Sequence, residues 1–120
     1  MAEVIIFHNP NCSTSRFAVE TANEVGADFE ERRYLNKAEA PTRDEIVELL
    51  SMLEDPATDL VRRDANFDKL GLVEADVTST EQVADVLAQH PELLQRPLLV
   101  RGGVAIIGRP KDRIEPFLRK

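Results

Sequence analysis

The chain has 120 residues, the usual size of one domain, and its 42% of hydrophobic residues suffice for a buried core. The chain contains no run of about 18 apolar residues of the kind that crosses a membrane. Its N-terminus lacks the basic and then apolar stretch of a secretory signal. A net charge of −7 argues against a general nucleic-acid binder. These features predict one cytoplasmic domain over residues 1–120 that binds neither membrane nor nucleic acid.

The N-terminal segment predicts a strand, a helix and a second strand. Residues 3–7 include four consecutive β-favouring residues, and Asn9-Pro10 ends the run. Ser13 to Val25 has apolar residues on one helical face, with Gly26 in place to end the helix. Phe29 to Leu35 is predicted as the second strand, with limited burial because its centre is charged.

The middle of the chain, at about residues 42–95, is predicted to contain helices and connecting loops without strands. Thr42 and Glu45 have the spacing of a capping box, and Asp55-Pro56 ends the helix that they open. A short helix should follow through Leu60 to Arg63. Thr78 to Glu81 offers a second capping box, and His90-Pro91 ends that helix.

The C-terminal segment predicts a hairpin and a closing helix. Residues 98–101 and 104–107 are apolar runs separated by Gly102-Gly103. Residues 111–120 should form a short helix, although Pro116 removes one backbone donor there. The element order predicts an α/β fold, a thioredoxin-like four-stranded mixed sheet with a helical block inserted at about residues 42–95.

Cys12 is the single cysteine, so the chain can form neither an internal disulfide nor a CxxC redox pair. One cysteine also excludes a thiolate-rich zinc site, and the sequence predicts no bound metal or cofactor. Any redox chemistry at Cys12 must therefore take its second sulfur from another molecule. The alternative is that Cys12 is a small buried apolar residue.

The surroundings of Cys12 favour a reactive thiol. Cys12 lies between the first predicted strand and the first helix, where free amides and the helix dipole stabilise anions and lower a thiol pKa. His8 and Arg16 could add positive charge, and Ser15 is one of three hydroxyl residues that follow the cysteine. Helix capping by the hydroxyls, and a purely structural His8, are the alternatives.

A second feature is the basic stretch from Arg96 to Arg113, where five basic residues face one acidic residue, Asp112. This local surplus could hold a small anion or could form an ordinary solvated surface.

The segment His8-Asn9-Pro10-Asn11-Cys12-Ser13-Thr14-Ser15-Arg16 resembles the active-site loop of the glutaredoxin-linked arsenate reductase family. The resemblance extends over nearly the whole chain. Its further segments are Pro41-Thr42-Arg43-Asp44-Glu45, Leu60-Val61-Arg62-Arg63, Gln89-His90-Pro91, Arg96-Pro97-Leu98-Leu99-Val100 and Gly108-Arg109-Pro110.

The resemblance implies that Cys12 is the nucleophile and that Arg62, Arg96 and Arg109 hold the oxyanion. Arg63 is the less favoured equivalent of Arg62. His8 matches a histidine that helps to tune the thiol, and Pro97 matches a proline that faces the cysteine and is often cis.

The implied function is reduction of arsenate to arsenite, with glutathione or another small thiol as reductant and a glutaredoxin-like protein as partner. Phosphatase chemistry is disfavoured because its loop needs Cys-x5-Arg, whereas Arg16 follows Cys12 by four residues. A redox-sensing regulator would need a second cysteine where Ser15 stands. A non-catalytic partner-binding adaptor, or a reductase of similar type with another substrate, stays open.

Overall fold

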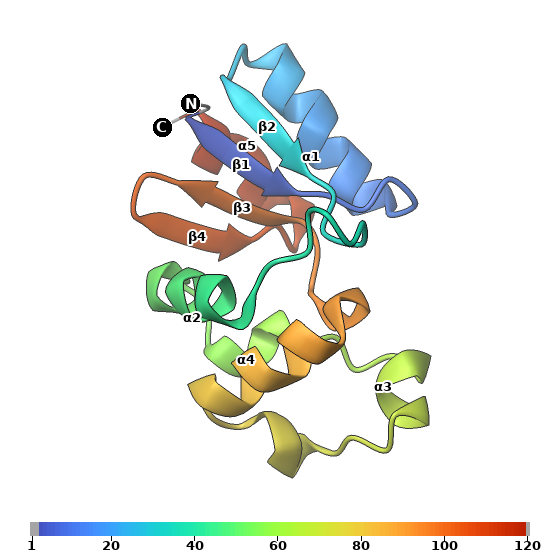
Figure 1. Cartoon of the computed structure of the whole chain (residues 1–120). Helices are drawn as coiled ribbons and strands as arrows, with labels where there is room; N and C mark the ends of the chain where they lie inside the picture. Colours follow the sequence, from blue (N-terminus) through green and yellow to red (C-terminus); the bar gives the residue numbers. More distant parts are fainter. Residues whose placement is uncertain (1–2, 120) are drawn as a thin grey trace.

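The computed structural model describes residues 3–119, so Met1, Ala2 and Lys120, which the domain prediction includes, lie outside the described residues. Four strands form one mixed sheet in the order β2-β1-β3-β4 (Figure 1). They are β1 (Val4–Phe7), β2 (Phe29–Arg32), β3 (Leu98–Arg101) and β4 (Val104–Ile107). Strand β1 runs parallel to β2 and antiparallel to β3, which pairs antiparallel with β4. The predicted sheet, in which the N-terminal strand joins the C-terminal hairpin, is confirmed.

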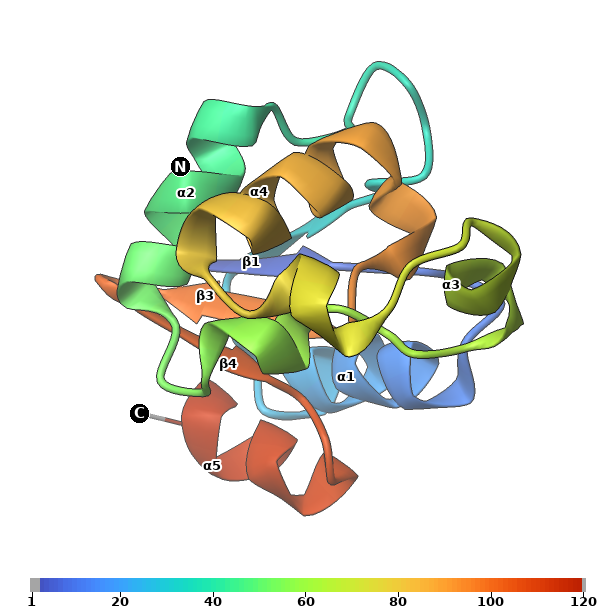
Figure 2. The ribbon, with the colours of Figure 1, turned by 90° about the horizontal axis from the view of Figure 1, so that it is seen from below.

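Both faces of the sheet are covered by helices (Figure 2). Helices α1 (Ser13–Glu24) and α5 (Ile114–Leu118) lie on one face, where Val4 and Ile6 are fully buried. Phe7 and Leu98 belong to the core on the other face, beneath the helices that follow β2. This alternation follows from the two-residue period of a strand and explains why these strands read as continuous apolar runs.

The helical block between β2 and β3 packs mainly through α2 against α4. Backbone pairing between Leu53 and Ala105 ties it to strand β4. The Asp55 carboxylate strengthens this link, because it accepts from the amide of Ile107 at 3.0 Å and from the guanidinium of Arg113 at 2.9 Å. The block comprises α2 (Arg43–Met52), α3 (Ala65–Lys69) and α4 (Thr80–Gln89), with 3-10 helices η1 (Ala57–Leu60), η2 (Glu74–Val77) and η3 (Pro91–Leu93).

Two element boundaries differ from the prediction near the site. Strand β2 ends at Arg32 rather than at residue 35, because the amide of Tyr34 turns back to the Arg32 carbonyl at 3.0 Å. The predicted helix through Leu60 to Arg63 is instead η1, which ends at Leu60, and Val61 then pairs with Leu94. The first difference comes from a local turn, and the second from pairing between segments that are distant in sequence.

The second capping box lies one residue later than predicted. Ser79 Oγ accepts from the amide of Gln82 at 3.1 Å, and Gln82 Oε1 accepts from the amide of Ser79 at 3.0 Å. Thr78 has helical dihedral angles and Ser79 extended ones, so only Ser79 has the backbone of an N-cap residue. The first box, between Thr42 and Glu45, forms as predicted.

The C-terminal segment is a 3-10 helix, η4 (Lys111–Arg113), followed by α5. Pro116 lies in the first turn of α5, where a backbone amide would lack an intrahelical acceptor, so the proline does not break the helix. Of the helices in residues 3–119, none has the length and apolar character that spanning a bilayer requires.

Candidate active site

Cys12 is the N-cap residue of α1, in the loop that connects β1 to this helix. Its amide donates to the Asn9 carbonyl at 3.0 Å, and its carbonyl accepts from the Arg16 amide at 3.0 Å. The side chain is only 7% exposed. The thiol is therefore held at the open N-terminal end of a three-turn helix, as the sequence predicts, where unpaired amides favour an anion.

The pKa of the Cys12 thiol is lowered from its ordinary value. Burial by itself would raise this pKa, and hydrogen bonds outweigh the effect of burial. They come from the backbone of Ser15, the side chain of Arg96 and the backbone of Thr14, and the positive charge of Arg96 acts in the same direction. Donors and cations that stabilise the thiolate thus surround the sulfur.

Two of the three predicted arginines lie at the sulfur. Arg109 Nη2 donates to Cys12 Sγ at 3.3 Å, and Arg109 Nε donates to the Arg96 carbonyl at 2.7 Å, which fixes the direction of the guanidinium. Arg96 belongs to the segment before β3 and acts on the thiol from there. Its Nε is buried with no hydrogen-bond partner among residues 3–119. The sulfur thus contacts the guanidinium that follows β4 and is stabilised as a thiolate by the guanidinium that precedes β3.

Arg62 is brought to the same region by backbone pairing but is held by a carboxylate. The Arg62 amide donates to the Leu93 carbonyl at 2.8 Å, which places Arg62 beside the segment that carries Arg96. Its Nη1 lies 3.3 Å from the Asp64 carboxylate, with both side chains about one-quarter exposed. No contact between Arg62 and Cys12 is present in the described part of the chain.

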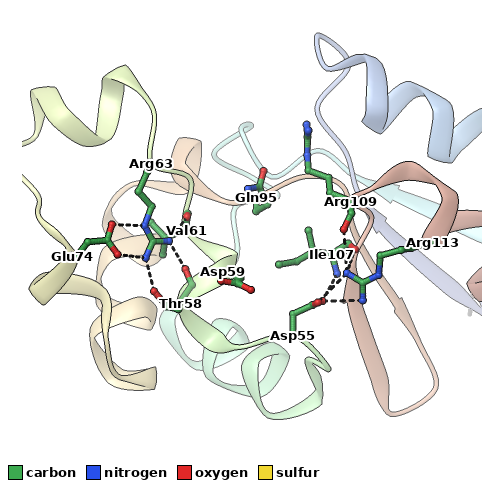
Figure 3. A pocket seen from close by; sticks show the side chains of 10 residues that line it. All are labelled: Asp55, Thr58, Asp59, Val61, Arg63, Glu74, Gln95, Ile107, Arg109 and Arg113. Atoms are coloured by element: carbon green, nitrogen blue, oxygen red, sulfur yellow. Dashed lines mark hydrogen bonds and ion pairs between the residues drawn. The ribbon is translucent and has the colours of Figure 1, made fainter.

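Arg63 points away from the site, into a cavity of about 590 Å³ that Figure 3 shows from close by. It is paired with Glu74 at 3.0 Å and also donates to Thr58. On the opposite wall, Arg113 is paired with Asp55, and the guanidinium of Arg109 is directed out of the cavity (Figure 3). Because these cations already face carboxylates, the cavity is a poor anion site.

The basic stretch from Arg96 to Arg113 is therefore not one patch. Arg101 is bound to the Glu3 carboxylate and to the Leu118 carbonyl, and Lys111 lies over the ring of Phe17 at 5.2 Å. Only Arg96 and Arg109 of this stretch approach the sulfur.

His8 and Ser15 support the loop from within. His8 Nδ1 lies 2.7 Å from Ser15 Oγ, which also accepts from the amide of Asn9 at 3.0 Å. Burial lowers the pKa of His8 and outweighs the opposing effect of Glu31, 3.6 Å away, so the imidazole is neutral at pH 7. The expectation that His8 adds positive charge is wrong. Its contact is with Ser15.

Arg16 lies in the first turn of α1 and forms no hydrogen bond with the sulfur among the described residues. Its guanidinium donates to the carbonyl of Pro10 at 2.9 Å on the exposed side of the loop. Arg16 thus stabilises the loop backbone, and its positive charge contributes to the lowered pKa of His8.

Pro97 begins the segment that leads into β3, and the Arg96–Pro97 peptide bond is cis. The Arg109–Pro110 bond is also cis, which the sequence analysis did not anticipate. The amide of Gly108 donates to the Pro97 carbonyl at 2.8 Å. A Cβ at residue 108 would lie 2.7 Å from Pro97 Cγ and 3.1 Å from Ile114 Cγ1, so the close approach of the two arginine-bearing segments requires glycine there.

Tyr34 follows β2 and is fully buried. Its hydroxyl has no hydrogen-bond partner within the described residues. Burial raises the pKa of the phenol, and the charges of Arg96, Cys12 and Arg62 are all close enough to act on it. The phenol therefore lies beside the arginines of the site.

A family model described as the ArsC family matches residues 7–117. The chain belongs to the ArsC family. An arsenate reductase from Neisseria meningitidis is 34% identical over 120 residues, covering 98% of this chain and 100% of that protein. One from Escherichia coli strain K12 is 35% identical over 119 residues, covering 98% of this chain and 82% of that protein. The solved structure of an arsenate reductase from Vibrio cholerae has a TM-score of 0.84 and 28% identity, with 98% of each chain covered.

In this ArsC-family protein the predicted site residues are assembled in part. Arg109 contacts Cys12, and Arg96 acts on its thiol. His8 and Ser15 contact each other beneath the Cys12 loop, and Arg62 is paired with Asp64. The thioredoxin-like arrangement brings together the loop after β1 and the segments flanking the β3–β4 hairpin, since β3 is the antiparallel neighbour of β1.

Sequence reasoning missed Tyr34 in this ArsC-family chain. Its segment is predicted as a weakly buried strand, which gives the single tyrosine of the sequence no place in the site. The signal that identifies Tyr34 is its burial, which only the folded structure shows. A tyrosine that is buried must place its hydroxyl against a polar group.

Proposed function

We propose that this protein is an arsenate reductase in which the Cys12 thiolate is the nucleophile. The observation that carries the proposal is the position of Cys12 Sγ, 3.3 Å from Arg109 Nη2, at a helix N-terminus and with a lowered pKa. Membership of the ArsC family, and the arsenate reductases among its relatives, support arsenate as the substrate. Arsenate reduction is therefore the activity to test first.

The arginines form the anion site of this proposal. Guanidinium groups bind tetrahedral oxyanions through paired, charge-assisted hydrogen bonds. Arg96 and Arg109 are already beside the nucleophile, and the unpartnered Nε of Arg96 is a donor that an arsenate oxygen would satisfy. Arg62 completes the set by exchanging the Asp64 carboxylate, which it meets at the protein surface, for the substrate.

The reaction proceeds in three steps. The Cys12 thiolate attacks arsenic and a protonated oxygen leaves as water, giving a sulfur–arsenate adduct. The sulfur of an external thiol then attacks Cys12 Sγ, and the sulfur–arsenic bond breaks with its electron pair remaining on arsenic, so As(V) becomes As(III). Because the chain has no second cysteine, another molecule must reduce the mixed disulfide left on Cys12, and a glutaredoxin-type protein is the proposed reductant.

The lowered thiol pKa supplies only part of the acceleration. A lower pKa raises the thiolate fraction, but it also makes the thiolate a weaker nucleophile. With a Brønsted slope of about 0.4–0.5, this weakening cancels roughly half of the logarithmic gain in rate. Positioning arsenate against the sulfur and neutralising its charge must supply the rest. This makes the arginines as important as the cysteine.

The test is a reduction assay with arsenate, glutathione, glutaredoxin, glutathione reductase and NADPH. Arsenite formation in wild type and its loss in Cys12→Ser are expected, since a hydroxyl is too weakly acidic to supply the nucleophile. A parallel assay with thioredoxin and its reductase distinguishes the two electron donors. Full activity in Cys12→Ser, or the absence of arsenite with every donor, would overturn the proposal.

Intact-mass measurement provides a second readout. Incubation with arsenate and glutathione, without glutaredoxin, should add one glutathione mass to wild type and none to Cys12→Ser. Turnover without this adduct would identify a different resolving thiol.

A further inference from the structure

We propose that the phenol hydroxyl of Tyr34 is a substrate-binding group, which donates a hydrogen bond to the oxyanion held beside Arg96 and Cys12. This inference rests on the proposed function. It adds to three cationic ligands a neutral donor from a different segment of the chain.

The first support is an unusual pair of unsatisfied groups. The Tyr34 hydroxyl and Arg96 Nε are both buried, and neither has a hydrogen-bond partner in residues 3–119. Buried polar groups are nearly always paired in native proteins, so each exception needs a reason. Both groups can donate, and both lack an acceptor. An arsenate oxyanion presents several acceptor oxygens and would satisfy the two together.

The second support is where the backbone places Tyr34. The Arg32 carbonyl accepts from two amides, that of Tyr34 at 3.0 Å and that of His8 at 2.9 Å. The shared carbonyl places the backbone of Tyr34 beside that of His8, where the loop that carries Cys12 leaves the sheet. Its ring belongs to the buried cluster that contains Leu94 and Leu98, the residues on either side of Arg96-Pro97.

Electrostatics agrees with this placement. Arg96 lowers the pKa of the phenol by its charge and by a side-chain interaction with the hydroxyl, Arg62 lowers it by charge, and Cys12 raises it. Burial has the largest effect and raises the pKa overall. The hydroxyl thus keeps its proton at neutral pH and can act as a donor.

Tyr34→Phe is the decisive variant because it removes the hydroxyl and keeps the ring. A hydroxyl that is unpaired in the anion-free protein contributes nothing to folding, so Tyr34→Phe should unfold at the same temperature as wild type or higher. The hydrogen bond to the bound anion is lost, and the Kd for arsenate, from the dependence of Tm on arsenate concentration, should rise about 10- to 100-fold. The KM for arsenate should rise with it.

Thr21→Val is the matched control. Thr21 is also a buried hydroxyl residue, 4% exposed, and its Oγ1 donates to the Phe17 carbonyl at 2.8 Å within α1. Removing this satisfied hydroxyl should lower Tm and leave the Kd for arsenate unchanged. Tyr34→Phe should therefore change the Kd for arsenate without lowering Tm, and Thr21→Val should lower Tm without changing the Kd.

The wild-type chain permits a measurement that needs no substitution. It contains one tyrosine and no tryptophan, so its near-ultraviolet absorbance and tyrosine fluorescence report on Tyr34. Titration with arsenate should change both signals, with the same midpoint as the Tm shift, and equal ionic strength of sodium chloride should not.

The outcomes separate this inference from the proposed function. If arsenate neither stabilises wild type nor is reduced by it, the proposed function fails. If wild type binds arsenate while Tyr34→Phe binds it equally well, or while the tyrosine signal stays constant, the inference about Tyr34 is overturned. A Tyr34→Phe protein that does not fold leaves the tyrosine titration to decide.

Discussion

Arg109 Nη2 and Cys12 Sγ lie 3.3 Å apart although 97 positions separate the two residues in the chain. Arg109 reaches the sulfur because the segment after β4 is held against the one before β3, through the Arg96 carbonyl and the Gly108 amide. The anion site thus depends on the packing of two chain segments against the N-terminus of α1.

Arg96→Ala and Arg109→Ala should each lower kcat/KM for arsenate about 10- to 100-fold, since each removes a charge-assisted hydrogen bond. Steady-state kinetics of arsenite formation measures this loss. Arg101→Ala is the matched control, because Arg101 belongs to the same basic stretch but binds Glu3 and Leu118. Equal losses in all three variants would contradict a specific anion site.

Arg96→Ala should also raise the pKa of the Cys12 thiol towards its ordinary value, because Arg96 stabilises the thiolate by hydrogen bond and by charge. The rate of iodoacetamide alkylation as a function of pH gives this pKa directly. Wild type should react at lower pH than Arg96→Ala, and Arg101→Ala should match wild type. A shared titration curve would mean that Arg96 does not act on the sulfur.

Folding stability should depend on pH through the same thiol. The pKa of Cys12 is lower in the folded protein than in the unfolded chain, where it is about 8.5. The stabilisation is therefore complete above the unfolded pKa and disappears as the pH falls through the folded pKa. The difference in unfolding free energy between wild type and Cys12→Ser should increase in urea titrations as the pH rises towards about 9. A constant difference would contradict it.

Ser15→Ala should destabilise the fold by about 1–3 kcal/mol, because it leaves His8 Nδ1 and the buried amide of Asn9 without their shared partner. Urea unfolding measures the loss. Ser13→Ala removes an exposed hydroxyl from the same first turn of α1 and should change stability little. If both variants are as stable as wild type, the contacts of Ser15 with His8 and Asn9 do not stabilise the fold.

Gly108→Ala should lower stability by about 1–3 kcal/mol and reduce arsenate turnover, since its Cβ would meet Pro97 Cγ at 2.7 Å and displace the segment that carries Arg109. Gly103→Ala is the control, with no atom within 4 Å of the added Cβ. Thermal unfolding and kinetics of the two variants check the expectation. Wild-type turnover in Gly108→Ala would show that the close approach is unimportant.

The sequence alone determined the features that depend on neighbouring residues. Three apolar runs predicted β1, β3 and β4, a mixed run from Phe29 predicted β2, and the spacing of Thr42 and Glu45 predicted a capping box. The position of Cys12 between a strand and a helix was also local information, so its place at a helix N-terminus could be predicted without tertiary structure. Propensity and periodicity act over a few residues, and here they were sufficient.

Only the tertiary structure decided which polar side chains meet. Arg63 is occupied by Glu74 and Arg101 by Glu3, while Arg96 and Arg109 turn to the sulfur, and no local pattern distinguishes these arginines. The neutral state of His8 and the full burial of Tyr34 likewise follow from segments that are distant in sequence. A long side chain adopts the direction in which its charge or hydrogen bond is satisfied, and that partner is known only when the chain has folded.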